Sequence, residues 1–207
     1  MIMVMEGPSA AGKTTWCRTH CPDLLGGNAS ENLAAPDLYD EPQAVAHFWV
    51  EFNVKQWQSA LQIEKQKGIA VCDGDPLHLY FSWALWKAGS LTRNLFDAEL
   101  PWYRRAIEEG RIGFADLVLW REAPLEELRR RAKSDSTRRR RRHELYLSMI
   151  PWMKIWFAAR ARVLHGTVRE LSDQFHIEGF RAFPPSSCRY DATVLDSMVR
   201  IVTERVD

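Results

Sequence analysis

The stretch from Gly7 to Thr15, which reads GPSAAGKTT, constrains the fold of this chain more than any other feature. It fits the pattern GxxxxGK[ST], in which a glycine-rich loop joins a strand to a helix and its backbone N–H groups surround a phosphate group. The apolar run Met1 to Met5 comes just before it and is typical of a strand buried on both faces. The residues after Thr14 allow a helix. The strand, loop and helix that the motif requires are therefore all predicted.

The residue types in this loop suit a nucleoside triphosphate. Gly7 and Gly12 let the backbone turn tightly and come close to an anion, and the loop N–H groups and the positive end of the helix then face the phosphates. Lys13 supplies a positive charge near the β and γ phosphates, and the Thr14 hydroxyl is a ligand for Mg²⁺. The sequence thus predicts that ATP and Mg²⁺ bind at Gly7, Ser9, Ala10, Ala11, Gly12, Lys13, Thr14 and Thr15.

Composition and charge limit the remaining choices. The 207 residues are 46% hydrophobic and 27% charged, which predicts one soluble domain over residues 1–207. A net charge of +1 gives no global nucleic-acid or membrane signature. The absence of an apolar run long enough to span a bilayer predicts no membrane segment. Because the first residues enter a core strand, we expect no signal peptide and a cytoplasmic protein. The sequence leaves room for a homodimer.

Hydrophobic periodicity and turn residues predict an alternation of strands and helices. Strands are expected at 1–5, about 28–33, 69–72, 116–120 and 167–171. Helices are expected at 13–20, 43–67, from Asp75-Pro76 onward, about 100–109, 124–132, about 142–164 with a kink at Pro151, and 192–206.

Two acidic residues follow the strand expected at 69–72. Asp73 lies at the carboxyl end of that strand, where ligand groups gather in open α/β sheets. We expect Asp73 to hold Mg²⁺ through waters or to accept the proton of an attacking hydroxyl, with turn capping as the alternative. Asp75 before Pro76 is a good helix N-cap, and contact with a substrate hydroxyl is its second interpretation.

An arginine-rich segment contains nine positive charges in the 14 residues 129–142. Three interpretations are open: a lid that closes over ATP, a patch for nucleic acid, or a solvated helix face. Near-contiguous like charges repel one another and favour an anionic partner. The lid is favoured over a polynucleotide partner by a family resemblance that covers this segment.

Several segments resemble thymidylate kinases and deoxynucleoside kinases, and small kinases of the chloramphenicol phosphotransferase type share the architecture. The segment Gly68-Ile-Ala-Val-Cys-Asp73 is similar to their glycine, apolar strand and terminal Asp. Ala115 to Trp120 and Ala123 to Arg131 resemble their fourth strand and the helix leading to the lid, and Arg138 to Glu144 resembles the lid. Together with the P-loop, the resemblance covers residues 1 to about 173. It implies a three-layer α/β sandwich around a five-stranded parallel sheet of order 2-3-1-4-5, with the lid at approximately 131–143.

The resemblance also implies roles for particular residues. Arg131 would contact ATP, and Arg138 and Arg142 would stabilise the charge of the transferred phosphoryl group; His143 would be a surface residue of the lid. Glu31 lies where these kinases carry a base after their second strand, and it is favoured over Glu41, which mimics their Glu-Pro pair. The helix at 43–67 would face the phosphoryl acceptor. The acceptor-binding candidates are Trp49, Asn53, Trp57 and Asp75.

One departure concerns the residue after Asp73. The resembled kinases usually carry an arginine there that helps to hold a phosphate, whereas this chain has Gly74. We therefore expect an ATP- and Mg²⁺-dependent kinase whose small-molecule acceptor is a nucleoside or nucleotide. An alcohol on an antibiotic or another natural product is the alternative acceptor. An ATP-regulated nucleic-acid-binding protein is the alternative from another functional class.

Overall fold

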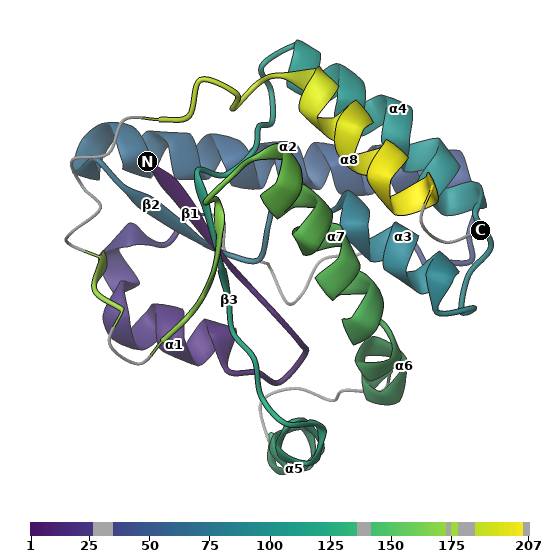
Figure 1. The fold of residues 1–207 in the computed structure, drawn as a ribbon, viewed down its shortest axis with the longest axis horizontal. Helices are drawn as coiled ribbons and strands as arrows, with labels where there is room; N and C mark the ends of the chain where they lie inside the picture. The colour runs from purple at the N-terminus through teal and green to yellow at the C-terminus, as the bar shows by residue number, and fades with distance from the viewer. Residues whose placement is uncertain (27–34, 136–141, 173–174, 178–184, 205–207) are drawn as a thin grey trace.

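The computed structural model describes residues 1–26, 35–135, 142–172, 175–177 and 185–204. Its centre is a parallel sheet of strands β1 (Ile2–Glu6), β2 (Ala70–Asp73), β3 (Leu117–Trp120) and β4 (Val168–Glu170), in the order β2-β1-β3-β4 (Figure 1). These strands and their order were predicted correctly. The register places Met5 of β1 opposite both Asp73 and Leu119. The carboxyl ends of β2, β1 and β3 therefore lie beside the loop that follows β1.

The prediction of a five-stranded sheet needs correction, because the described part of the chain holds four strands. The strand expected at 28–33 falls outside the described residues. The chain before it does reach the outer edge of β2, where Leu25 forms an isolated parallel bridge with Val71. At Gly26, a Cβ would lie only 2.6 Å from Ala60 Cα, so the chain passes tightly under the neighbouring helix.

The helices occupy most of the predicted segments. They are α1 (Lys13–His20), a short 3₁₀ turn (Pro22–Leu24), α2 (Pro42–Lys67), α3 (Leu79–Lys87), α4 (Asn94–Glu108), α5 (Leu125–Ser134), α6 (His143–Ser148), α7 (Ile150–Val163) and α8 (Ala192–Glu204). The helix expected from Asp75 begins only at Leu79. The helix expected over 142–164 is divided at Met149, because Pro151 starts a new helix in its first turn.

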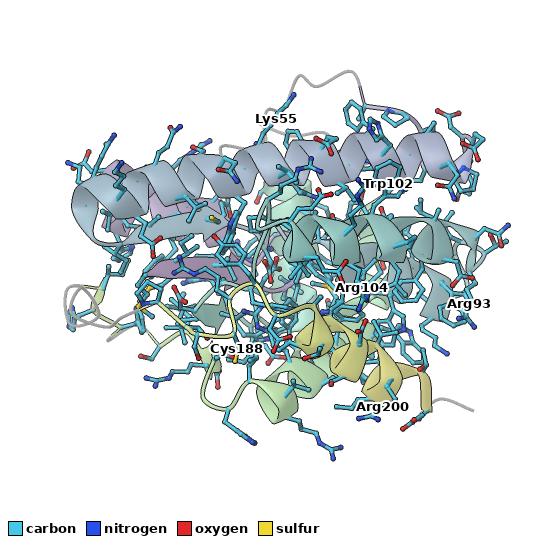
Figure 2. All side chains as sticks on the ribbon, turned by 90° about the horizontal axis from the view of Figure 1, so that it is seen from above. Lys55, Arg93, Trp102, Arg104, Cys188 and Arg200 are labelled. Atoms are coloured by element: carbon cyan, nitrogen blue, oxygen red, sulfur yellow. The ribbon has the colours of Figure 1, made fainter. Side chains whose placement is uncertain are left out.

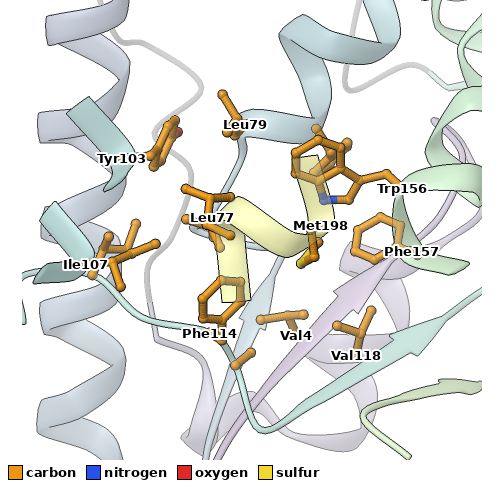
Figure 3. Close-up of a cluster of buried hydrophobic side chains, with 14 of the residues drawn as sticks. Val4, Leu77, Leu79, Tyr103, Ile107, Phe114, Val118, Trp156, Phe157 and Met198 are labelled. Carbon is orange, nitrogen blue, oxygen red and sulfur yellow. The ribbon is translucent and has the colours of Figure 1, made fainter. Parts of the chain in front are cut away.

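Helices cover both faces of the sheet. Met3 and Met5 of β1 pack against Trp16 and Cys17 of α1, whereas the alternate residues Ile2 and Val4 face the larger helical layer of α2, α3, α4, α7 and α8. Figure 3 shows this second layer, in which Val4 and Val118 meet Phe114, Trp156, Phe157 and Met198. The expected three-layer arrangement of helices, sheet and helices is thus present.

The longest helix forms one side of the larger helical layer. Figure 2 shows α2 running beside α4, with Lys55 on the face of α2 that is turned away from the protein. Glu41 caps α2 by accepting a 2.8 Å hydrogen bond from Ala44 N, and Gly68 ends it in the left-handed conformation. No helix in the described part of the chain has the length and apolar character needed to cross a membrane.

Candidate active site

The loop between β1 and α1 has backbone angles that favour glycine at both ends. Gly7 has φ 138°, and a Cβ there would lie 2.2 Å from the carbonyl oxygen of Arg121. Gly12 has φ 89° and is the N-cap residue of α1, and Ala10 between them also has a positive φ of 69°. These turns direct the N-terminus of α1 toward a cavity. This local geometry agrees with the predicted phosphate-binding loop.

Three polar side chains meet at the start of α1. Lys13 Nζ donates hydrogen bonds to the carbonyl oxygens of Gly7 at 2.6 Å and Pro8 at 3.0 Å. The Thr14 hydroxyl donates to Asp73 Oδ2 at 2.5 Å. Because Met5 pairs with Asp73 across the sheet, the strand register alone brings this carboxylate next to the loop. The Lys13 ammonium group is therefore bound to the backbone of its own loop, and the Thr14 hydroxyl and the Asp73 carboxylate are in direct contact.

A cavity of about 690 Å³ opens in front of the loop. It brings together every residue predicted to bind ATP or Mg²⁺. Its lining includes Gly7, Ser9, Ala10, Ala11, Gly12, Lys13, Thr14, Thr15, Asp73 and Arg131.

The residues at this cavity fit a bound Mg²⁺ ion. Mg²⁺ prefers hard oxygen ligands and is usually held by one or two carboxylates or hydroxyls together with waters and substrate phosphates. The Thr14 hydroxyl and the Asp73 carboxylate are oxygen donors in direct contact at the mouth of the loop. This donor set suits an ion that is delivered with a nucleotide.

Two arginines donate hydrogen bonds to the same carbonyl oxygen of the loop. Arg131 of α5 donates from Nη1 to the carbonyl oxygen of Ala11 at 3.1 Å, and Arg121 donates from Nε to the same oxygen at 2.9 Å. The backbone N–H of Arg121 also donates to the Glu6 carbonyl at 2.7 Å. Arg131 was predicted for this site, whereas Arg121 was missed. The available signal was its position directly after β3, the strand that pairs with β1.

Glu6 is a second residue that sequence reasoning missed. Its side chain is buried at the end of β1 and accepts hydrogen bonds from Asp75 N at 2.6 Å, Tyr80 Oη at 2.9 Å and Gly7 N at 3.2 Å. Burial raises the pKa of Glu6, and the nearby Lys13 ammonium opposes that rise. Glu6 therefore ties the phosphate-binding loop to the segment after β2.

Asp75 does not cap a helix, in contrast to the leading prediction. Its Oδ2 accepts a 2.8 Å hydrogen bond from Arg160 of α7, and its Oδ1 accepts one of 3.0 Å from Leu77 N. Both partners of this ion pair are almost completely buried. Burial raises the pKa of Asp75, and Arg160 opposes the rise. Asp75 also lines the second cavity, so its contact with a substrate stays a prediction.

Two smaller cavities share lining residues with the first one. The second, of about 220 Å³, is lined by Asp73, Gly74, Trp49 and Asn53 among others, and Asn53 also donates to Tyr103 Oη at 2.7 Å. The third, of about 350 Å³, shares Trp49 with the second. His78 borders all three cavities. The pKa of His78 is lowered to about 4, because burial disfavours the imidazolium and Lys13 repels it.

Trp57 requires a correction. It was predicted to contact the acceptor, but its side chain is fully buried in the core and lines none of the three cavities. Its ring packs edge-on against Tyr190, and its Nε1 donates to Tyr190 Oη at 3.4 Å. Gln56, the residue before it, does line the second cavity, so Trp57 is excluded because its side chain is directed into the core.

The predicted base and lid residues are only partly described. Glu31 and Arg138 lie outside the described residues, and Glu41 serves as the cap of α2. Arg142 lines the third cavity and forms a 3.1 Å ion pair with Asp37. His143, expected on the surface of the lid, is buried instead.

Comparisons with known proteins bear on this geometry. No protein-family model matches the sequence, and no curated protein matches it. Solved structures do match the fold. A deoxyadenosine kinase from M. mycoides with bound dATP aligns with a TM-score of 0.61 and 12% identity over 86% of this chain and 94% of that chain.

Two further structures of the same enzyme agree. The one with the products dCMP and a flexible dCDP gives a TM-score of 0.61 at 11% identity over 99% of this chain and 98% of that chain. The one with bound dCTP gives 0.52 at 12% identity over 86% and 94%. At this identity the likeness concerns the fold. The chain therefore has the P-loop fold of deoxynucleoside kinases, as the resemblance in its sequence predicted.

Proposed function

We propose that this protein is a kinase that transfers the γ-phosphoryl group of ATP to a hydroxyl group of a nucleoside-like acceptor, with Mg²⁺ as the metal. One observation carries the proposal: the phosphate-binding loop, Lys13 and the Thr14–Asp73 pair border a cavity that shares lining residues with a neighbouring cavity walled by aromatic side chains. A phosphate donor and an organic acceptor would then meet at Asp73. The fold shared with deoxyadenosine kinase supports the same reaction class.

ATP would be held by the backbone of the loop and by Lys13. Loop N–H groups and the start of α1 would face the phosphates, and Lys13 would leave the carbonyls of Gly7 and Pro8 for the phosphate oxygens. Thr14 and Asp73 would hold Mg²⁺, which supplies neutralisation of charge on the transferred group. Arg131, which now donates to Ala11, would add a cation from the lid helix. Arg138 and Arg142 remain proposed for the same purpose.

The acceptor would enter from the second and third cavities. Trp49 borders both of them and offers a face for a planar ring. Gly74 has φ 106° and no side chain to hold a phosphate, which favours a bare hydroxyl over a monophosphate. The three neighbours are named as deoxyadenosine kinase, and we propose a deoxynucleoside-like acceptor for this chain by that analogy.

Asp73 is the described carboxylate best placed to take the proton of the attacking hydroxyl. It borders both the loop cavity and the second cavity, whereas Glu41 is committed to Ala44 N. Glu31 remains a proposed base. Asp73 would also orient Thr14, so that its metal-holding and proton-accepting roles stay alternatives within one site.

Because position 74 is a glycine and not an arginine, an alcohol on another natural product, such as an antibiotic, remains the second candidate acceptor.

Polynucleotide binding has less support. Arg129 pairs with Glu144 at 3.1 Å, and Arg130 and Arg131 pair with Glu127 at 2.7 and 2.6 Å. These carboxylates offset part of the charge that a polyanion would otherwise meet.

The proposal is tested by incubating the protein with ATP, MgCl₂ and one acceptor at a time. The acceptors are deoxyadenosine, deoxycytidine, thymidine, their 5′-monophosphates and a set of hydroxylated antibiotics. ADP release and the mass of the phosphorylated product are measured, with Lys13→Ala as the control. We expect phosphorylated nucleoside. Transfer to monophosphates alone would contradict the bare-hydroxyl proposal, and transfer to antibiotics alone would favour the second candidate.

A further inference from the structure

Glu99 of α4 is a buried carboxyl group that the proposed reaction leaves without a role. It is only 5% exposed and lines the third cavity, of about 350 Å³. The aromatic side chains Trp49, Phe81 and Tyr146 line the same cavity. Cavities of this size with apolar walls and a few polar groups are typical of sites for small organic molecules. Glu99 is therefore a polar group on the wall of an otherwise largely apolar chamber.

The contacts of Ser82 define which way the proton of this group points. The Ser82 hydroxyl lies 3.2 Å from the carbonyl oxygen of Leu79 and is also hydrogen-bonded to Glu99 Oε2. A serine hydroxyl carries one proton, and a carbonyl oxygen can only accept. Both contacts are hydrogen bonds at the same time only when Ser82 donates to Leu79 and Glu99 donates to Ser82. This arrangement requires a protonated Glu99.

The surroundings of Glu99 also favour the neutral acid. The charged residues of the cavity wall, Asp37 and Arg142, pair with each other. His78 is kept neutral by its lowered pKa, and Tyr103 carries a hydroxyl whose pKa is raised well above its usual value, mainly by burial. No cation among the described residues pairs with Glu99. Burial accordingly raises the pKa of Glu99 to about 8.

We propose that neutral Glu99 is a specificity-determining residue of the acceptor chamber and selects planar rings that carry an N–H donor on their edge. With the proton of Oε2 directed to Ser82, Oε1 is left as a hydrogen-bond acceptor. An amino group on a ring satisfies it, whereas a carbonyl group at the same place opposes it with a second acceptor. A site built in this way discriminates strongly, because the wrong partner leaves a buried polar group unsatisfied. This inference rests on the proposed function for the identity of the chamber.

Equilibrium binding of matched nucleosides tests the selection without requiring turnover. Deoxyadenosine and deoxyinosine, or deoxycytidine and deoxyuridine, differ by an amino group in place of a carbonyl group. We expect the wild type to bind the amino member of each pair about tenfold more tightly, measured by calorimetry. Glu99→Gln keeps this preference, because its amide donates to Ser82 and leaves an oxygen for the ring. Glu99→Leu loses it. Glu108→Gln, an exposed change on the same helix, is the matched control.

The opposing outcomes are distinct. A preference that survives in Glu99→Leu, a loss in Glu99→Gln as large as in Glu99→Leu, or binding of neither member of a pair would overturn the proposal. The infrared difference spectrum between wild type and Glu99→Gln near neutral pH gives a second readout. We expect the carbonyl band of a protonated carboxyl, and a carboxylate band in its place would also overturn the proposal. If selective binding occurs without phosphoryl transfer, the proposed function fails while the role of Glu99 stands.

Discussion

The hydroxyl of Thr14 donates a 2.5 Å hydrogen bond to Oδ2 of Asp73, which joins two segments separated by 59 positions in the chain. Thr14 lies in the first turn of α1, and Asp73 is the last residue of β2. The contact follows from the parallel pairing of β1 and β2, in which Met5 stands opposite Asp73. Any chemistry at the end of the phosphate-binding loop therefore takes place beside this carboxylate.

Replacing Asp73 by Asn removes its charge while leaving an oxygen that can accept from Thr14. We expect turnover to fall about 10²- to 10⁴-fold, the range for a positioned acid–base or metal-holding group, and the Kd for ATP to change much less. Steady-state kinetics and ATP binding measure the two effects. Asp97→Asn, at an exposed position on α4, is the control. A large loss of ATP affinity with normal turnover would make Asp73 structural.

Replacing Lys13 by Ala removes the cation that now bridges the carbonyls of Gly7 and Pro8. The ammonium is solvated in part by its own loop, so its loss costs little in folding but removes a charge aimed at the phosphates. We expect phosphoryl transfer to drop to background with a near-native melting temperature. Lys55→Ala, on the outward face of α2 (Figure 2), serves as the control. Undiminished turnover in Lys13→Ala would exclude the proposed role of the loop.

Arg121 orients a peptide of the loop through its carbonyl. The C=O of Ala11 and the N–H of Gly12 belong to one trans peptide and point in opposite directions, so Arg121 fixes the direction of that N–H by binding the carbonyl. We expect Arg121→Gln to raise the Kd for ATP about tenfold, consistent with the loss of a hydrogen bond from a charged donor. Calorimetric titration with ATP measures it, and Arg105→Gln is the exposed control. An unchanged Kd would leave Arg121 without this role.

The buried ion pair between Asp75 and Arg160 gives a prediction about stability. Arg160→Met leaves a buried carboxylate without its cation, and we expect a loss of about 3 to 5 kcal/mol in the free energy of unfolding. Asp75→Asn combined with Arg160→Met should recover much of that loss, because no charge is then left unpaired. Urea unfolding measures both, and Arg93→Met, which removes an exposed pair with Asp97, is the control. Equal losses in the single and double variants would contradict the argument.

Local patterns in the sequence predicted the loop and the strands that position it. The glycines of the loop and the apolar runs of β1, β2 and β3 are local features, and a parallel sheet needs little more to bring the ends of its strands together. Asp73 could be placed for this reason. The fold of the solved deoxyadenosine kinase structures agrees with the resemblance that these segments carry.

Residues whose partners are distant in the chain could not be placed in this way. Asp75 before Pro76 has the local pattern of a helix cap, but an arginine 85 positions later pairs with it in the core. Helical spacing put Trp57 on the same helix as Trp49 without indicating that its side chain is directed into the core. Glu6 and Arg121 have no motif of their own, and their positions at the ends of β1 and β3 acquire meaning only once the strands are adjacent.

The raised pKa of Glu99 predicts how stability depends on pH. The folded protein retains the proton of Glu99 up to a pKa of about 8, whereas the unfolded chain releases it near 4.5. Between these values the folded state binds one more proton, so the stabilisation is complete below the lower value and is lost as the pH rises through the upper one. The slope is about 1.4 kcal/mol per pH unit. The pKa of His78, lowered from 6.5 to about 4, gives the opposite slope at lower pH.

Glu99→Gln carries no titrating proton and retains His78, so the difference between the two proteins isolates Glu99. We expect the wild type to lose stability relative to Glu99→Gln steadily as the pH rises from about 5 to 8, and the two curves to run parallel above that. Urea unfolding at several pH values measures the difference, and Glu108→Gln should show none of it. A difference that stays constant across this range would mean that Glu99 is ionised in the folded protein, because an ionised carboxylate has no extra proton to release.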